Sequence, residues 1–217
     1  MKFLCRAVLF DMDGTLVDST LVVERTWRRW AERHAIPADE VLRFSHGRPT
    51  NATLEHFLPG QDHAAELEEM GRFEESELNE IVPVPGADAA VRSVMNGPWA
   101  IVTSAWRKLA VARVLGAGLP LPEVLVPVDE IEHGKPDPEG YLTAASRLGV
   151  APKDCLVFED TRPGIEAGLN AGMNVVGLLT TVPAEQLAHQ PLIRDFRQMR
   201  AEPRGTEFEI EIAAEPT

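Results

Sequence analysis

The stretch Ala7-Val8-Leu9-Phe10-Asp11-Met12-Asp13-Gly14-Thr15 is the most informative part of the chain, because an apolar run ends there in two carboxylates. The run at 7–11 predicts a buried parallel strand. Ligands of open parallel sheets bind beyond the carboxyl ends of the strands, so Asp11 and Asp13 would face such a crevice. Side chains two residues apart on an extended backbone lie on the same side, and a hard cation such as Mg²⁺ would relieve the repulsion between the two carboxylates. Taken alone, the stretch is also compatible with a turn that carries two solvated acids.

Further apolar runs bounded by turn residues predict four more buried strands, at 100–103, 124–126, 156–159 and 175–178. Helical spacing of apolar residues predicts helices at 87–95, 105–115 and 138–148, and Pro163 is expected as the first residue of another helix that ends before Gly172. Because strands and helices alternate, we predict an α/β fold with a doubly wound parallel sheet. The period-two stretch at 206–212 predicts an edge strand with an acidic outer face.

The stretch from about residue 16 to residue 82 interrupts this alternation, because it contains only helical patterns. Val23, Trp27 and Trp30 would line one face of a first helix. A later segment at 62–81 carries eight acidic side chains, which we interpret as a solvated helix face. We therefore predict a core domain formed by residues 1–16 and 83–217, with an inserted all-helical cap domain at 17–82.

The composition narrows the possible functions. The chain has 217 residues, of which 44% are hydrophobic and 25% charged, as expected for a globular protein with a buried core. Its 34 acidic and 21 basic residues give a net charge of −13, which argues against nucleic acid or a membrane as a partner. An anionic substrate would therefore need a local positive site, which a metal ion would supply. We expect no transmembrane segment or signal peptide, and reduced, buried Cys5 and Cys155 in a cytoplasmic protein.

Three other groups of polar residues follow predicted strands. Thr103 and Ser104 close one strand, Glu159 and Asp160 close another, and Lys135 lies in the loop after a third. Each group alone has an ordinary interpretation: a helix N-cap, acidic turn residues or a solvated loop lysine. Together with Asp11 and Asp13 they predict a phosphoryl-transfer site, which needs a nucleophile, a metal and a cationic clamp. A carboxylate nucleophile would form an aspartyl-phosphate that water then hydrolyses.

These four motifs, in this order and with a helical insert after the first, resemble the haloacid dehalogenase-like hydrolase superfamily, in its subfamily with a helical cap. The resemblance covers about residues 1–185, and within the superfamily 23–27, 45–48 and 101–104 look most like bacterial hexose and hexitol phosphatases. It implies that Asp11 is the nucleophile and a metal ligand, and that Asp13 is the general acid and base, with its backbone carbonyl on the metal.

The resemblance also implies roles for the other motif residues. Asp160 would be the third metal ligand, Glu159 would reach the metal through water, and Lys135 would clamp the nucleophile and the phosphate. Thr103 or Ser104 would bind the phosphate, and the sequence leaves the choice between them open. In the cap, His46 and Arg48 would hydrogen-bond sugar hydroxyls, although their loop is also compatible with an ordinary exposed surface.

The predicted function is a Mg²⁺-dependent phosphomonoesterase for small sugar or sugar-alcohol phosphates, acting as a monomer or small homo-oligomer on a small phosphate ester. One alternative is a phosphosugar mutase of the β-phosphoglucomutase type, but such mutases carry a cap histidine where this chain has Val23. Another is a phosphatase for phosphoglycolate or glycerol phosphate. A receiver-type signalling domain also combines acids, a hydroxyl residue and a lysine, but it is shorter, lacks a cap and does not accept phosphate on its first strand.

Overall fold

A parallel sheet of six strands forms the centre of the computed structural model, which describes residues 1–45, 48, 50–187 and 191–213. The strand order is β6-β5-β2-β7-β8-β9. The strands are β2 (Ala7–Phe10), β5 (Trp99–Val102), β6 (Val124–Val126), β7 (Cys155–Glu159), β8 (Asn174–Leu178) and β9 (Leu192–Ile193). Strand β2 pairs in parallel with β5 on one side and β7 on the other. The predicted doubly wound parallel sheet is confirmed, and its first strand lies in the middle.

Helices cover both faces of this sheet because alternate residues of each strand point to opposite faces. Val8 and Phe10 pack toward α5 (Ala87–Val94) and α6 (Arg107–Gly116), whereas Ala7 and Leu9 pack toward the other face. That second face is covered by α7 (Glu139–Leu148) and α8 (Arg162–Asn170). Pro163 is the second residue of α8 rather than the first, because Thr161 caps the helix by accepting a hydrogen bond from the amide of Gly164. The remaining short helices are η2 (Val128–Glu130), η3 (Pro152–Asp154), α9 (Ala184–Leu187) and η4 (Phe196–Gln198).

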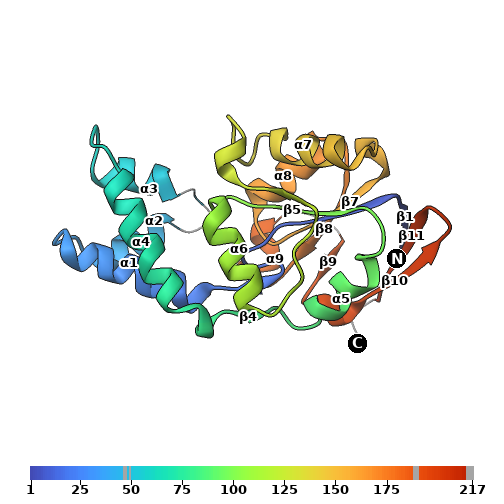
Figure 1. Cartoon of the computed structure of the whole chain (residues 1–217), viewed down its shortest axis with the longest axis horizontal. Coiled ribbons are helices and arrows are strands. Elements are labelled where there is room, and N and C mark those ends of the chain that lie inside the picture. The colour runs from blue at the N-terminus through green and yellow to red at the C-terminus, as the bar shows by residue number, and fades with distance from the viewer. Residues whose placement is uncertain (46–47, 49, 188–190, 214–217) are drawn as a thin grey trace.

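Four helices and a short 3-10 turn follow the first sheet strand and lie together at one end of the molecule (Figure 1). They are α1 (Thr20–Arg33), α2 (Ala38–Ser45), α3 (Thr50–Phe57), α4 (Ala64–Ser76) and η1 (Leu78–Glu80), and we call them the helical insert. The insert has its own apolar cluster around Trp27, Trp30 and Leu54. The expectation of helix alone between 16 and 82 is wrong at both ends of this stretch. There β3 (Val17–Asp18) and β4 (Val82–Pro83) pair antiparallel and satisfy each other's backbone groups.

A second sheet of three antiparallel strands lies at the opposite end, beside the N-terminus (Figure 1). Its order is β1 (Lys2–Cys5), β11 (Glu207–Ile212) and β10 (Met199–Arg204). The prediction of an edge strand at 206–212 is wrong, because β1 and β10 flank that strand on both sides. Its alternation is as predicted: Phe208, Ile210 and Ile212 are buried, and the glutamates between them are not.

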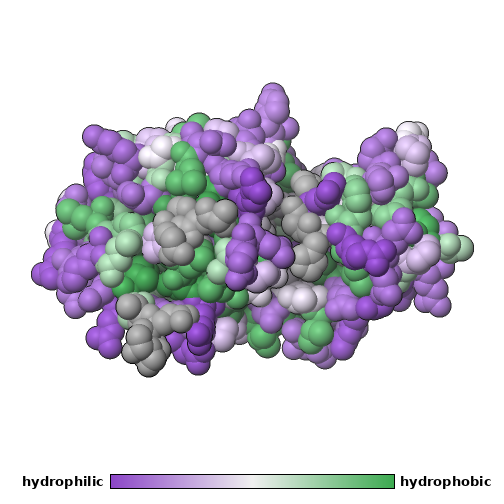
Figure 2. Space-filling view, turned by 180° about the vertical axis from the view of Figure 1, so that it is seen from behind, coloured by the Kyte–Doolittle hydropathy of each residue, from purple (hydrophilic) through white to green (hydrophobic). Residues whose placement is uncertain are grey.

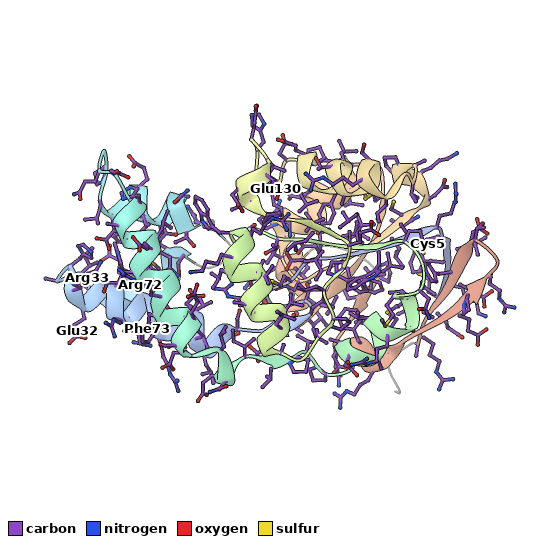
Figure 3. All side chains as sticks on the ribbon, in the orientation of Figure 1. Cys5, Glu32, Arg33, Arg72, Phe73 and Glu130 are labelled. Atoms are coloured by element: carbon purple, nitrogen blue, oxygen red, sulfur yellow. The ribbon has the colours of Figure 1, made fainter. Side chains whose placement is uncertain are left out.

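Most charged residues lie on the surface, as the composition predicts, but one glutamate of the acidic run is buried. Hydrophilic residues follow most of the outline of the molecule in Figure 2, and Figure 3 shows Arg33 and Arg72 on the outer part of the insert. The acidic run at 62–81 is not entirely a solvated face, because Glu74 is only 5% exposed and is ion-paired with Arg113 of α6. Both cysteines are free and buried, as predicted. Within the described residues, no helix combines the length and apolar character needed to span a membrane.

Candidate active site

The turn after β2 sets the position of both predicted aspartates. The amide of Asp11 donates to the carbonyl of Phe158 in β7 at 3.0 Å, which fixes the end of the strand. The carbonyl of Met12 then accepts from the amides of Leu16 and Val17 at 2.8 and 3.0 Å, so the chain curls back on itself. Gly14 at the tip has a φ of +80°, and a Cβ there would lie 2.8 Å from the Cγ of Asp160. Only glycine lets this turn approach the neighbouring strand so closely.

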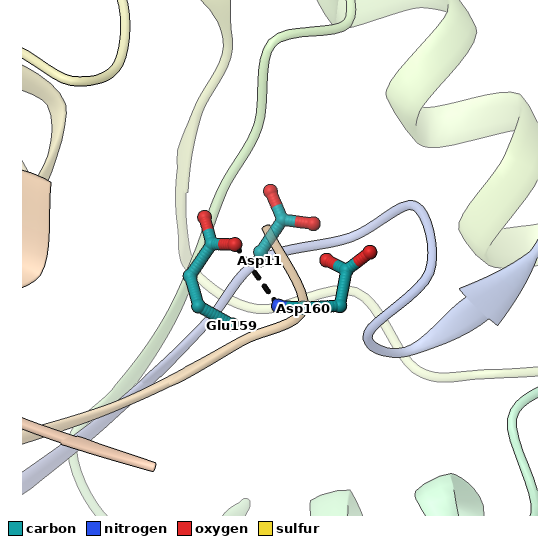
Figure 4. Close-up of side chains that lie close together, drawn as sticks. All are labelled: Asp11, Glu159 and Asp160. Carbon is teal, nitrogen blue, oxygen red and sulfur yellow. Dashed lines mark hydrogen bonds between the residues drawn. The ribbon is translucent and has the colours of Figure 1, made fainter. Parts of the chain in front are cut away.

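Three carboxylates meet at the carboxyl edge of the sheet (Figure 4). Oxygens of Asp11, Glu159 and Asp160 all lie within 4.8 Å of one another, and all three residues are buried. Burial raises the pKa of Asp11 well above its usual range although Lys135 opposes the shift, and burial with the charge of Glu159 raises the pKa of Asp160 to about 7. Three buried carboxylates face one lysine, so the cluster lacks positive charge. A set of hard oxygen ligands with excess negative charge fits a divalent cation such as Mg²⁺.

Lys135 joins two of these carboxylates. Its Nζ contacts Asp11, and it donates to Oε1 of Glu159 at 2.5 Å and to the carbonyl of Val102 at 3.2 Å. Burial opposes the charge, but Asp11 and Glu159 outweigh it and raise the pKa of Lys135, so the ammonium persists. Lys135 thus contacts Asp11, the residue that the sequence analysis expects it to clamp.

Hydrogen bonds to both oxygens fix the orientation of the Glu159 carboxylate. Its Oε1 also accepts from the Tyr141 hydroxyl at 3.0 Å, and its Oε2 accepts from the amides of Asp160 and Thr161 at 3.1 and 3.2 Å. These amides belong to the approach to α8, where the helix N-terminus favours an anion. A Cβ on Gly164 would overlap this carboxylate, so that glycine is also required. Glu159 thus orients Lys135 as well as adding charge to the cluster.

Several residues at the site have no counterpart in the sequence prediction. Asp160 accepts hydrogen bonds from Thr15 at 3.0 Å and from Thr181. Tyr141 contributes from α7, with its ring 5.4 Å from the Nζ of Lys135. Thr15 could have been found from the sequence, since it completes the Asp-x-Asp-Gly-Thr stretch. No sequence pattern points to Tyr141 or Thr181, because a helix and a loop distant in sequence bring them to the site.

Asp13 also has hydrogen-bond partners that the sequence analysis did not predict. Its Oδ1 accepts from the hydroxyl of Ser19 at 2.6 Å, and its Oδ2 accepts from Arg113 at 2.6 Å. The other terminal nitrogen of Arg113 contacts Glu74 in α4. Asp13 is thus connected to the helical insert on both sides.

The two hydroxyl residues after β5 differ in their surroundings. Thr103 is 3% exposed, and its Oγ1 accepts from the amide of Ala105 at 3.0 Å, whereas Ser104 is exposed. Both line a small depression together with Lys135 and Tyr141. The structure thus brings both hydroxyl residues to the neighbourhood of the lysine.

Of the two predicted specificity residues of the insert, only Arg48 belongs to the described residues. His46 lies outside the described residues. Arg48 is exposed, with its guanidinium 4.2 Å from the ring centroid of Phe44 in α2. Phe44 also stacks on His56 of α3 at 3.8 Å.

The fold agrees with the comparisons to known proteins. Hexitol phosphatase A of Escherichia coli is 42% identical over 194 residues, which span 87% of this chain and 90% of that protein. Validoxylamine A 7'-phosphate phosphatase of Streptomyces hygroscopicus is 37% identical, over 90% of this chain and 96% of that protein. A putative β-phosphoglucomutase from Thermotoga maritima has a similar structure, with a TM-score of 0.67 and 27% identity over 88% of this chain and 95% of that one. Residues 5–172 match the haloacid dehalogenase-like hydrolase family, and the chain therefore belongs to that family.

Proposed function

We propose that this hydrolase is a Mg²⁺-dependent phosphomonoesterase for small sugar or sugar-alcohol phosphates. Its membership of the family and its phosphatase relatives make it a phosphoric monoester hydrolase. The single observation that carries the reaction is the position of Asp11, whose carboxylate contacts the Lys135 ammonium and has an oxygen within 4.8 Å of oxygens of Glu159 and Asp160. A carboxylate held there can attack phosphorus while the surrounding charges are balanced.

The metal would be held by the carboxylates of Asp11 and Asp160 and by the backbone carbonyl of Asp13, with Glu159 reaching it through water. When bound, Mg²⁺ would neutralise phosphate charge and orient the phosphoryl group. The hydroxyls of Thr15 and Thr181 would keep Asp160 in place for this purpose.

The reaction has two steps. Asp11 attacks phosphorus, the bond between phosphorus and the sugar oxygen breaks, and Asp13 gives its proton to the leaving alcohol. Asp13 then takes a proton from a water molecule, which attacks phosphorus and breaks the bond to Asp11, releasing phosphate. Lys135 stays protonated throughout and offsets the negative charge on Asp11 and the phosphoryl group.

We assign the phosphate-binding hydroxyl to Thr103 rather than Ser104. The Oγ1 of Thr103 already accepts from the amide of Ala105, so the hydroxyl hydrogen is left to donate to a phosphate oxygen. Thr103 also directly follows Val102, whose carbonyl accepts from Lys135. Its hydroxyl is therefore anchored next to the clamp.

Residues 17–82 would act as a cap on a core of residues 1–16 and 83–217, with β3 and β4 as the neck on which the cap moves. His46 and Arg48 would then contact sugar hydroxyls and contribute to substrate choice. Free, buried thiols are typical of reducing compartments, which favours the cytoplasm as the location. The negative net charge favours small-molecule substrates over nucleic acid.

The test is phosphate release from hexose, hexitol, pentose and glycerol phosphates and phosphoglycolate, with Mg²⁺ or with EDTA. We expect metal-dependent turnover, highest on six-carbon substrates, and its loss in the Asp11→Asn variant with the fold retained. Preference for glycerol phosphate or phosphoglycolate would refute the substrate class. A need for a bisphosphate activator, without free phosphate, would identify a mutase. Phosphate release by Asp11→Asn would refute the nucleophile.

A further inference from the structure

Tyr141 is a buried polar residue that the steps above do not use. It is the single tyrosine of the chain, it is 0% exposed in the first turn of α7, and its hydroxyl donates to Oε1 of Glu159 at 3.0 Å. That turn packs tightly on β5, because a Cβ on Gly140 would lie 2.9 Å from Cγ1 of Val102. Packing alone would be served equally by phenylalanine, which fills the same space without a polar group to satisfy. The hydroxyl is therefore better explained by its effect on Glu159.

The ammonium of Lys135 already uses all of its donors. An ammonium has three N–H groups. Here they meet three acceptors, the carboxylate of Asp11, Oε1 of Glu159 at 2.5 Å and the carbonyl of Val102 at 3.2 Å. A lysine that clamps a phosphoryl group must therefore give up one of these hydrogen bonds when the substrate binds.

Glu159 is the acceptor that depends least on Lys135. Its Oε2 accepts from the amides of Asp160 and Thr161 at 3.1 and 3.2 Å and from the Thr161 hydroxyl at 3.1 Å. Its Oε1 also has the Tyr141 hydroxyl, so four donors remain on Glu159 without Lys135. Within the described part of the chain, the carboxylate of Asp11 and the carbonyl of Val102 accept from no side chain besides Lys135.

We propose that Tyr141 is a positioning residue that lets Lys135 exchange its hydrogen bond to Glu159 for one to the phosphoryl group. When that group binds, the ammonium shifts so that one N–H donates to a phosphate oxygen, and it keeps its contact with Asp11. The Tyr141 hydroxyl stays on Oε1, so this buried carboxylate oxygen is not left without a donor. The inference rests on the proposed function, because it takes Lys135 as the clamp on the phosphoryl group.

The ring of Tyr141 supports the same exchange. The Nζ of Lys135 lies over it, 5.4 Å from the centroid, which is within the range of a cation–π contact. This attraction acts on the charge of the ammonium rather than on one N–H, so it persists whichever acceptors the ammonium has. An ammonium that loses its hydrogen bond to Glu159 is thereby kept beside that carboxylate.

The first test is Tyr141→Phe, which keeps the ring and removes the hydroxyl. Oε1 of Glu159 then has Lys135 as its single donor, so the ammonium is held more tightly there and is less available to a phosphoryl group. In saturating Mg²⁺ we expect the inhibition constant of orthovanadate, a mimic of the phosphoryl group, to rise by about 10-fold, the scale of one hydrogen bond to a charged group. We expect a similar fall in kcat/KM for sorbitol 6-phosphate, with the fold retained by circular dichroism.

Thr161→Val is the matched comparison, because it removes a hydroxyl from the other oxygen of the same carboxylate. Oε2 keeps its two amide donors, and Oε1 keeps both Lys135 and Tyr141. The change also removes the hydrogen bond from the Gly164 amide that caps α8. We therefore expect Thr161→Val to lose more stability in urea than Tyr141→Phe, but less affinity for orthovanadate.

The second test needs no variant, because a single tyrosine gives a single signal. With ¹³C at Cζ of tyrosine, the protein shows one tyrosine resonance, which moves downfield when the phenol donates more strongly. As Lys135 leaves Oε1 of Glu159, the bond from Tyr141 should strengthen, since two donors no longer share that oxygen. Adding orthovanadate to the wild-type protein in saturating Mg²⁺ should therefore move the resonance downfield. Mg²⁺ is present before and after, so the movement reports on the phosphoryl mimic alone.

Three results would overturn the inference. One is a Tyr141→Phe variant that binds orthovanadate as tightly as the wild type. Another is a Thr161→Val variant that loses as much affinity, because the hydroxyls would then merely hold Glu159 in place. The third is a wild-type tyrosine resonance that stays where it is when orthovanadate binds. A wild-type protein that neither hydrolyses sorbitol 6-phosphate nor binds orthovanadate would instead overturn the proposed function, and this inference with it.

Discussion

A methyl group added at Gly14 tests how the first motif and Asp160 fit together. The residue has a φ of +80°, and a Cβ there would lie 2.8 Å from the Cγ of Asp160 and closer still to its Oδ2 and to the hydroxyl of Thr181. Asp160 is 1% exposed, so its carboxylate has little free space into which it can move. Gly14→Ala must therefore displace a proposed metal ligand.

The magnitude has two parts. An alanine in the left-handed region costs about 1 kcal/mol. Displacing Asp160 also breaks its hydrogen bonds from Thr15 and Thr181, and bonds to a charged group contribute about 1.5–3 kcal/mol each. We expect Gly14→Ala to lower the free energy of unfolding by about 3–5 kcal/mol, because the site relaxes in part. Affinity for Mg²⁺ should fall by at least about 10-fold, as when the support of a metal ligand is lost.

Gly149→Ala is the matched control. Gly149 ends α7 with a φ of +66°, and a Cβ there would have nothing within 4 Å, so this variant should lose only the conformational cost of about 1 kcal/mol. Urea unfolding in EDTA gives both free energies, and a titration followed by the Mg²⁺-dependent rise in Tm gives the affinities. Equal losses of stability in the two variants, with unchanged Mg²⁺ affinity, would refute the close approach of Gly14 to Asp160.

Three further predictions follow from charge and burial. Lys135→Met leaves the three carboxylates without their cation, so urea unfolding in EDTA should show a free energy of unfolding that is lower by about 3–5 kcal/mol, and Mg²⁺ should partly restore it. An unchanged free energy would contradict the pairing of Lys135 with the carboxylates. Burial raises the pKa of Cys5 to about 12 and that of Cys155 to about 11, so alkylation at pH 8 should be far slower in the native than in the urea-unfolded protein. The thiols lose their protons at lower pH in the unfolded than in the folded protein, so the free energy of unfolding should also fall as the pH rises above 9. The fall should be smaller in the double variant Cys5→Ala/Cys155→Ala. Since the net charge of −13 repels anionic substrates, kcat/KM at saturating Mg²⁺ should rise when KCl increases from about 10 to 150 mM; a fall would show that the positive field at the site dominates.

The sequence predicted most of the central sheet because its longer strands are short apolar runs, and β2, β5 and β7 lead directly into polar residues. Burial on both faces requires such runs, and the carboxyl ends of parallel strands share one edge. Asp11, Lys135, Glu159 and Asp160 could therefore be assigned to one site although up to 149 positions separate them, and the structure brings them together. These residues meet because the topology of the sheet places strand ends that are far apart in sequence side by side.

The second sheet could not be predicted in the same way. Strand β1 has only four residues, and it pairs with β11 from the other end of the described chain. Strand β10 contains Pro203 and charged residues, which are typical of edges and loops. The alternation at 206–212 indicated a strand with one buried face, but no local signal reports how many neighbours a strand has. The pairing depends on contacts far apart in the chain.

The acidic segment of α4 shows why a pattern of charges does not tell which charge is buried. Glu74 and its neighbour Glu75 look alike in sequence, yet Glu74 meets the buried Arg113 and Glu75 meets the exposed Lys108. A charge can be buried only where an opposite charge is fixed beside it, and that partner lies 39 positions away in the chain. Among the lysines and arginines in ion pairs of the described residues, the least exposed side chains are Arg113 at 7% and Lys135 at 11%. One contacts Asp13 and the other Asp11, so this acidic chain places its two most buried cations on the two aspartates of its first motif.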